Sequence, residues 1–202
     1  MNYLAIDTSG KNLTIIISNG GEIYKYFDAE CGVSHSVSLM PQVEKLALEC
    51  GFDFTNADFF ACVVGAGSFT GIRIGVATVK ALCFAFNKPC LSITSFDTLA
   101  YNKANGKVLA LIDAKHNGFY CCGYDNGKVD IEPCYLMREQ VLPLLENYQA
   151  VSSTKIDGIE TALVSVVDGL VEAVAQKVDE LSEDIESLTP LYVRKSQAEE
   201  GR

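Results

Sequence analysis

Short apolar runs separated by turn residues open the chain. Positions 3–7, 13–18 and 22–27 are rich in Ile, Leu, Tyr and Phe, and Asn or Gly residues lie between them. Runs of this length, bounded by turn residues, are typical of β-strands joined in hairpins. The pattern therefore predicts a three-stranded meander at the start of the chain.

A helical spacing of apolar positions follows over 36–50, and Ser34 or Ser36 can cap its start. Gly51 is a typical helix stop. Pro41 must lie in the first turn or bend the helix, because an interior proline removes a backbone hydrogen bond and clashes with the preceding turn.

The next elements alternate between strands and helices. An apolar run at 59–64 predicts a strand, and a glycine-rich loop at 65–71 leads into a helix over 72–86. A further strand is predicted at 89–93, and a short helix at 95–100. This alternation is typical of an α/β fold.

The opening pattern then recurs. An apolar strand at 108–113 again ends in an aspartate, and two more strands are predicted at 119–124 and from Val129. In both copies 13 positions separate the strand-ending aspartate, Asp7 or Asp113, from the second hairpin turn. The recurrence indicates a duplicated βββαβα fold in two lobes. A chance match between two common strand–turn–strand units is the alternative.

The second copy becomes less regular toward its end. Its predicted elements are a helix at 138–146, a strand at 150–154, an amphipathic helix at 168–181 and an extended piece at 190–194. Asp168 is expected to cap the last helix, and 162–167 is ambiguous. The polar connection at 102–107 gives expected domains of 1–102 and 103–202.

Composition and charge narrow the class of protein. The 202 residues are 49% hydrophobic and 21% charged, which indicates a globular chain. Sixteen basic against 26 acidic residues give a net charge of −10, so strong direct binding to nucleic acid is disfavoured. Asp7 interrupts the first apolar run, and no apolar run approaches about 18 residues, so we expect neither a secretory signal nor a membrane span. The eight cysteines form no C-x-x-C pair and are expected to be reduced, as in a cytoplasmic protein.

An aspartate that ends a strand beside a glycine turn is the phosphate and metal arrangement of actin-like and sugar-kinase-like ATPases. Asp7, Ser9 and Gly10 have this arrangement, and Asp113 would be the counterpart in the second copy. The turn after Asp113 has no glycine before Gly118, however. Two purely structural hairpins are therefore an equal alternative.

The loop at 65–71 lies between a strand and a helix, as anion-binding loops do. It has neither the Gly-Lys-Ser/Thr of a Walker A loop nor the Rossmann glycine pattern, and Ser68 or Thr70 can instead cap the helix. Capping is the favoured interpretation. The candidate residues of a vestigial nucleotide or phosphate site are Asp7, Ser9, Gly10, Gly67, Ser68 and Asp113.

The two histidines, His35 and His116, are 81 positions apart. Nothing in their spacing supports a Ser-His-Asp triad or a metal site, so we expect them to have structural or surface roles.

The helix at 72–86 is apolar on nearly all sides, which predicts that two of its sides are covered. One stripe consists of Ile72, Val76, Val79, Leu82, Cys83 and Phe86, and the other of Ile74, Ala77, Ala81 and Ala85. The small residues would let a second helix approach closely. That helix can be the one at 36–50, or both helices can form an exposed apolar platform for a partner.

Several segments carry a resemblance to a known family. GAGSFTGIRIG (65–75) resembles the GPGSFTGLRIG signature of the bacterial TsaB (YeaZ) family, with Ala66 in place of the usual proline. LAIDTS, SHS with LMP, SFDTL, IDA and PLYVR also resemble that family and occur in the same order. The match extends over nearly the whole chain.

The resemblance implies a fold of the ASKHA (actin-like ATPase, ribonuclease H-like) type with a shortened second lobe. It implies a non-catalytic paralogue of TsaD, since only His35 lies where TsaD carries a metal-ligand histidine pair. It further implies a TsaD heterodimer that works with TsaE to transfer a threonylcarbamoyl group to N6 of the adenosine beside the anticodon in ANN-decoding tRNAs. The family's former glycoprotease label finds no support in these residues.

The partner surface implied by the resemblance is the two-helix platform, which homodimers of the family also use. The expected interface residues are Leu39, Met40, Val43, Ile74, Ala77, Thr78, Ala81 and Ala85. No cofactor is assigned to this chain, and ATP and a metal are expected on the partner subunits. The alternative function is an ATP-dependent small-molecule phosphotransferase that uses Asp7 and Asp113.

Overall fold

The computed structural model of the protein describes residues 1–102 and 106–194. The chain forms two compact units. The first consists of Met1–Ser95 and Ala173–Leu191, and the second of Phe96–Glu172 with the chain from Tyr192. The expected change of domain after residue 102 lies close to the observed change after Ser95, but the return of Ala173–Leu191 to the first unit differs from the expected division.

The first unit is built on a five-stranded sheet in the order β3-β2-β1-β4-β5. Its strands are β1 (Tyr3–Asp7), β2 (Leu13–Asn19), β3 (Glu22–Asp28), β4 (Phe59–Val63) and β5 (Cys90–Ile93). The first three pair antiparallel, which confirms the predicted meander, and β1, β4 and β5 pair parallel.

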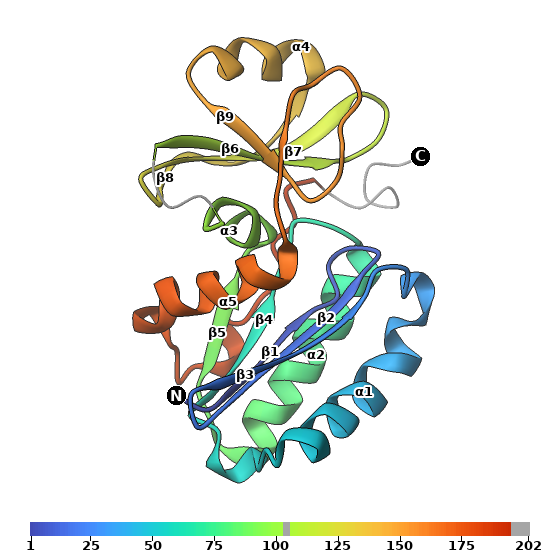
Figure 1. Ribbon diagram of the computed structural model, residues 1–202, viewed down its shortest axis with the longest axis vertical. Coiled ribbons are helices and arrows are strands. Elements are labelled where there is room, and N and C mark those ends of the chain that lie inside the picture. The colour runs from blue at the N-terminus through green and yellow to red at the C-terminus, as the bar shows by residue number, and fades with distance from the viewer. Residues whose placement is uncertain (103–105, 195–202) are drawn as a thin grey trace. The chain divides into compact units, whose positions relative to one another are not determined.

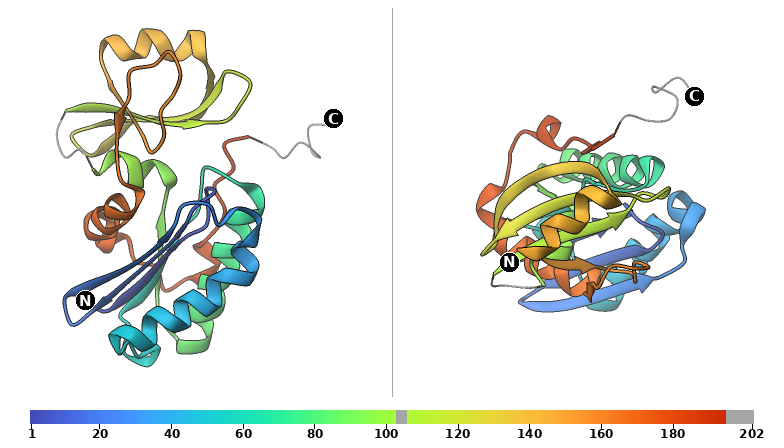
Figure 2. Two further views of the ribbon diagram at one scale, coloured as in Figure 1. Left: turned by 45° about the vertical axis from the view of Figure 1, so that its right-hand side comes forward. Right: turned by 90° about the horizontal axis from the view of Figure 1, so that it is seen from above.

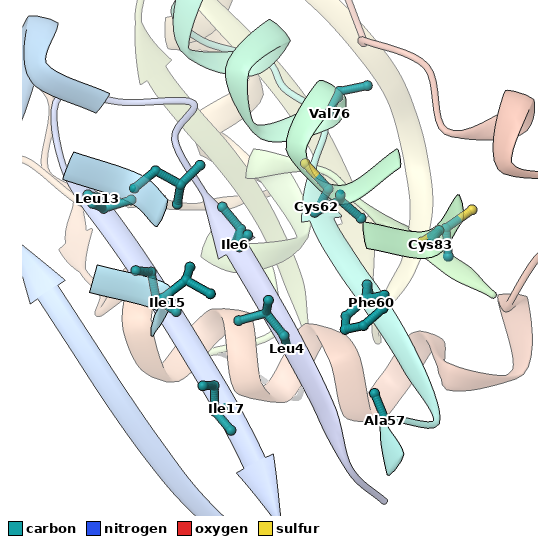
Figure 3. Close-up of a cluster of buried hydrophobic side chains, with 14 of the residues drawn as sticks. Leu4, Ile6, Leu13, Ile15, Ile17, Ala57, Phe60, Cys62, Val76 and Cys83 are labelled. Atoms are coloured by element: carbon teal, nitrogen blue, oxygen red, sulfur yellow. The ribbon is translucent and has the colours of Figure 1, made fainter. Parts of the chain in front are cut away.

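Two helices, α1 (His35–Cys50) and α2 (Phe69–Phe86), lie side by side on one face of this sheet (Figures 1 and 2). Each begins beyond the end of a strand that runs parallel to β1, so both run in the same direction back along the sheet. Alternate residues of β1 and β2 point to the same face of the sheet, and the α2 residues Val76 and Cys83 pack into that cluster (Figure 3).

The predicted ends of α1 are close to the observed ones. Gly51 follows the helix with φ of 63°, and its N–H donates to the carbonyls of Ala47 and Leu48. Pro41 lies inside the helix beyond its first turn.

The second unit repeats the architecture with a sheet in the order β10-β9-β6-β7-β8. Its strands are β6 (Lys107–Asp113), β7 (Gly118–Asp125), β8 (Lys128–Met137), β9 (Gln149–Ser152) and β10 (Ala162–Leu163). Strands β6, β7 and β8 pair antiparallel, and β6, β9 and β10 pair parallel, as in the first unit. The predicted duplication is confirmed.

The repeat is abbreviated where the second copy loses its regular pattern. In place of a 16-residue α1, the second unit has the four-residue α4 (Arg138–Val141), followed by a 3-10 helix at Leu142–Glu146. Pro143 lies in this second segment, where a regular helix would need its missing N–H. The predicted helical segment over 138–146 is confirmed, but it is divided into an α-helical part and a 3-10 part.

The remaining helical segments are short or lie near the boundaries of the two units. They are α3 (Ser95–Ala100), α5 (Val166–Lys177) and the 3-10 segments Gly32–Ser34, Phe54–Asn56, Val178–Glu180 and Ile185–Ser187. The expected cap of α5 is wrong: Asp168 lies inside the helix and donates its backbone N–H to Ser165 Oγ at 3.2 Å.

All eight cysteines are free thiols. Burial raises the pKa of Cys83, Cys121 and Cys122 to about 12, so these three thiols are protonated and unreactive at neutral pH.

Candidate functional site: a glycine loop and an exposed helix platform

The glycine-rich loop between β4 and α2 is held by its own capping bonds. Ser68 is the N-cap of α2, and its Oγ accepts the N–H of Gly71 at 3.2 Å. The Ser68 carbonyl accepts the N–H of Ile72 at 2.9 Å. The prediction that Ser68 or Thr70 caps this helix is thus confirmed for Ser68. Two N–H groups that an anion would need already have partners inside the loop.

The loop packs directly on the turn that follows β1. The N–H of Ser68 donates to the Ser9 carbonyl at 2.6 Å, and Thr8 Oγ1 donates to the Gly71 carbonyl at 2.7 Å. A Cβ atom at Gly67 would lie 2.2 Å from the Ser9 carbonyl oxygen, and one at Gly71 would lie 2.0 Å from the Thr8 carbonyl oxygen. These glycines are therefore explained by backbone contact within the first unit.

Asp7 lies buried at the end of β1, beneath the same turn. Its Oδ1 accepts the backbone N–H of Ser9 at 2.8 Å and the Ser9 hydroxyl at 2.6 Å. The Ser9 hydroxyl also lies 3.0 Å from Ser95 Oγ. Burial raises the pKa of Asp7 above its usual 3.8, although the Ser9 hydrogen bonds and the nearby His35 oppose this shift.

The structure brings Asp7, Ser9, Gly67 and Ser68 together in one packed junction, with Gly10 next to it in the β1–β2 turn. Asp113 belongs to the second unit. There it is partly exposed, and its carboxylate accepts the Lys115 N–H at 2.8 Å and pairs with Lys115 Nζ at 3.1 Å. Burial raises the pKa of Asp113, but the Lys115 bonds and the charges of Lys115 and Arg138 outweigh it and leave the pKa lowered.

The contrast between these two aspartates predicts opposite pH dependence. A raised pKa contributes stability that is complete below about pH 4 and is lost as pH rises through the folded-state pKa. A lowered pKa contributes stability above the unfolded-state pKa and loses it as pH falls. Relative to the native chain, the unfolding temperature of Asp7→Asn is therefore expected to rise between pH 4 and pH 7. That of Asp113→Asn is expected to fall as pH rises from about 2 to about 4 and to stay level above that range. Thermal unfolding followed by circular dichroism measures both, and parallel curves for native chain and Asp7→Asn would contradict the buried position of Asp7.

Of the two histidines, only His35 lies near this junction. His35 is buried at the start of α1, and its Nε2 donates to the Asn12 carbonyl at 3.0 Å. His116 lies on an exposed turn of the second unit. Among the described residues, no group of three or more His, Cys, Asp or Glu side chains is arranged to hold a metal ion.

The outer faces of α1 and α2 carry the most exposed large apolar side chains of the described residues. Phe84, Leu48 and Val37 are 83%, 79% and 75% exposed, and Met40 is 46% exposed. Ala77, Ala81 and Ala85 are exposed along one row of α2, four residues apart. We call these seven residues the helix platform.

Four of the eight expected interface residues, Met40, Ala77, Ala81 and Ala85, are exposed on this face. Ile74 and Thr78 are half-buried. Leu39 and Val43 do not lie on it, because both side chains are buried in the core. They lie one helical turn apart on the side of α1 that faces the sheet and pack in the core of the first unit.

Sequence reasoning missed Val37, Leu48 and Phe84. The spacing of each residue from the core positions of its helix could have placed it on the outer face. On α2, position 84 lies outside the core stripe formed by Ile72, Val76, Val79 and Cys83, on the side of the helix that carries the alanine row. Likewise, positions 37 and 48 lie opposite the core residues of α1.

Because α2 is also apolar on its outer face, its composition resembles that of a membrane-spanning helix. Of the helices in the described ranges, α2 is the one that is long and apolar enough to cross a membrane by length and composition alone, a test that core helices also pass. Arg73 and Lys80 interrupt its apolar surface, and Lys80 pairs with Glu186 at 2.8 Å.

Comparisons with known proteins agree with this architecture. The family model described as TsaD, tRNA N6-adenosine threonylcarbamoyltransferase, matches residues 29–185. The tRNA threonylcarbamoyladenosine biosynthesis protein TsaB of Bacillus subtilis is 33% identical over 149 residues, which are 71% of this chain and 60% of the relative. TsaB of Escherichia coli is 30% identical over 128 residues, 61% of this chain and 55% of the relative. The matches thus span less than two thirds of these relatives.

Two solved structures superpose on nearly the whole chain. The crystal structure of a Pseudomonas aeruginosa protein with similarity to peptidase YeaZ superposes with a TM-score of 0.77 and 23% identity, and covers 96% of this chain and 99% of that one. YeaZ of Pseudomonas aeruginosa gives a TM-score of 0.74 at 22% identity, over 95% and 99%. At this identity the likeness concerns the fold.

Two sheets of the same strand order and pairing, the second with a reduced helical layer, make this an ASKHA (actin-like ATPase) fold protein. The GAGSFTGIRIG segment forms the junction between the β1–β2 turn and α2. The chain belongs to the TsaB (YeaZ) family, within the wider TsaD family.

Proposed function

We propose that this chain is a non-catalytic scaffold subunit in tRNA threonylcarbamoyladenosine biosynthesis, acting in the cytoplasm. Its helix platform docks a TsaD-type transferase, and the assembly works with TsaE. The transferase supplies the residues that move the threonylcarbamoyl group to N6 of the adenosine beside the anticodon. ATP and metal belong to those partners.

The exposed platform is the observation that carries this proposal. Phe84, Leu48 and Val37 each present most of their side chain to solvent on two adjacent helices. Large apolar side chains gathered on one face mark surfaces that a partner covers. The exposed alanine row of α2 presents only small side chains, over which a partner helix can approach closely.

The interior of the first unit favours a scaffold over a phosphotransferase. Ser68 N–H, Gly71 N–H and Ile72 N–H are all engaged inside the loop or with the β1–β2 turn. Asp7 is buried and bonded to Ser9. A kinase would need such N–H groups and this carboxylate free for phosphate and metal.

Charge gives a second line of support. The chain carries −10, which opposes close approach of a tRNA phosphate backbone. A subunit that acts on tRNA through a partner does not need a basic surface of its own. The same platform can also pair two copies of the free chain.

Reconstitution tests the proposed function. The transferase, TsaE, ATP, the threonylcarbamoyl adenylate and an ANN-decoding tRNA are incubated with and without this chain. We expect the initial rate of modified-adenosine formation to fall at least about tenfold without it, and this chain alone to form none. Product formed by the chain alone, or an unchanged rate without it, would contradict the proposal. Calorimetry with MgATP separates the phosphotransferase alternative, which requires binding that Asp7→Ala abolishes.

A further inference from the structure

The second unit contains a hollow of about 470 Å³ that the docking function leaves unused. It lies at the amino-terminal ends of β9 and β10 and is bordered by the 3-10 helix that precedes β9. Because β6, β9 and β10 run parallel, this is the opposite end of the sheet from Asp113, the last residue of β6. The volume is within the range of small-molecule sites.

The buried part of the lining is apolar and held in place. Ala150 belongs to the core of the second unit, and Leu145 and Tyr148 pack against that core. The Tyr148 hydroxyl donates to the Asp130 carboxylate, which also accepts Lys107 Nζ at 3.1 Å. Its hydroxyl is thus in use, and the Tyr148 ring offers carbon surface to the hollow. The pairing of Asp130 with Lys107 leaves no net charge beside the ring.

The exposed part of the lining carries a single charge, which is negative. It is the carboxylate of Glu160, and among the described residues that line the hollow there is no lysine, arginine or histidine. Within residues 1–102 and 106–194 the Glu160 carboxylate has no hydrogen bond or ion pair, and the same holds for the side chains of Gln149 and Thr161. A ligand that enters therefore meets an unpaired carboxylate, an amide and a hydroxyl next to apolar surface.

These groups favour one charge and one shape of ligand. A phosphate or carboxylate would be repelled by Glu160 and would find no basic side chain in the lining. The carboxylate of a free amino acid would be left unpaired for the same reason. A primary ammonium has three N–H donors and no acceptor, and the oxygens of Glu160, Gln149 and Thr161 can accept them. The net charge of −10 also attracts a cation.

We propose that this hollow binds a primary ammonium group on an apolar body, supplied by a free alkylamine or by a lysine side chain of a partner protein. Glu160 pairs with the ammonium, and the hydrocarbon body covers the apolar part of the lining. Because Glu160 is exposed, water screens the ion pair, so we expect a dissociation constant of about 1 mM. The site belongs to the second unit, and its existence does not depend on the helix platform.

Nuclear magnetic resonance titration of the isotope-labelled full chain tests the site. The amine probes are pentylammonium and Nα-acetyl-lysinamide, and pentanol and pentanoate are the matched neutral and anionic ligands. We expect saturable shifts of the backbone amides of Gln149, Ala150 and Thr161 with the amines, binding of pentanol about fivefold weaker than that of pentylammonium, and no saturable binding of pentanoate. Tighter binding of Nα-acetyl-lysinamide than of pentylammonium assigns a lysine side chain, and the reverse assigns a free amine.

Glu160→Gln removes the charge and keeps the shape of the side chain. Its affinity for pentylammonium is expected to fall about fivefold, to that of pentanol. Glu146→Gln is the matched control, because Glu146 is an exposed glutamate of the same unit outside the lining, and its affinity should stay within about 1.5-fold of the native value.

Three results would overturn the proposal. The first is no saturable shift with either amine up to about 20 mM. The second is a set of shifts that excludes the amides of the lining. The third is a preference for pentylammonium over pentanol that persists in Glu160→Gln. The amide spectrum of each variant confirms that it is folded.

Discussion

Gly71→Ala is expected to lower the unfolding temperature by about 10 °C or to prevent folding. The new methyl carbon would lie 2.0 Å from the Thr8 carbonyl oxygen, and both atoms belong to well-fixed backbone at the junction of β1 and α2. Relief requires α2 to move away from the sheet, which removes packing from the core of the first unit. We expect a cost of about 3 kcal/mol or more, a large part of the total stability of a domain. Differential scanning calorimetry measures it.

Gly10→Ala provides the matched control. Its methyl carbon would meet Asn12 Oδ1 at 2.7 Å, but this atom is the end of a flexible side chain that can rotate away. The expected loss is below about 1 kcal/mol. Similar unfolding temperatures for Gly71→Ala and the native chain would show that the loop does not pack on the β1–β2 turn, and would restore the phosphate-loop interpretation.

Ala81→Arg is expected to abolish binding to a TsaD-type transferase while leaving the fold intact. Ala81 is exposed in the middle of the α2 row, so a long charged side chain there points into solvent in the free chain but obstructs the close approach of a partner helix. We expect the dissociation constant to rise at least about 100-fold, the effect of losing a central interface position. Sedimentation velocity measures the complex.

The control for this change is Ala175→Arg. Ala175 is also an exposed alanine in a helix, but it belongs to α5 and lies outside the platform. Its variant carries the same added charge and should bind the transferase with native affinity. Equal loss of binding in both variants would indicate a general charge effect.

Local patterning predicted much of this fold because its strands and helices have clean hydrophobic periods. The meander, both main helices and the second set of strands were predicted close to their observed limits. Gly51 was recognised as a helix stop because its role is local. The division of the helical segment at α4 was not predicted, because the effect of Pro143 depends on where the preceding helix ends.

The remainder depended on contacts between distant parts of the chain. The contact of Gly71 with Thr8 joins positions 63 apart, and only the folded junction shows why a side chain is excluded there. The return of Ala173–Leu191 to the first unit leaves no mark in periodicity.

The platform residues were partly misassigned for a different reason. Apolarity alone placed Leu39 and Val43 on the partner surface, although they share the core-facing side of α1 with Leu46 and Ala47. Helical phase separates these residues from Val37 and Leu48.

Side-chain footprinting with hydroxyl radicals tests the docking claim most directly, because Phe84, Leu48 and Met40 are exposed and reactive in the free chain. The chain is labelled at a concentration where it is monomeric, with and without a TsaD-type transferase. Val129 and Leu163 of the second unit, 48% and 62% exposed, serve as internal references. The account predicts that labelling of Phe84, Leu48 and Met40 falls severalfold in the complex while Val129 and Leu163 are unchanged. A stable complex in which the three platform residues keep their full reactivity would contradict it.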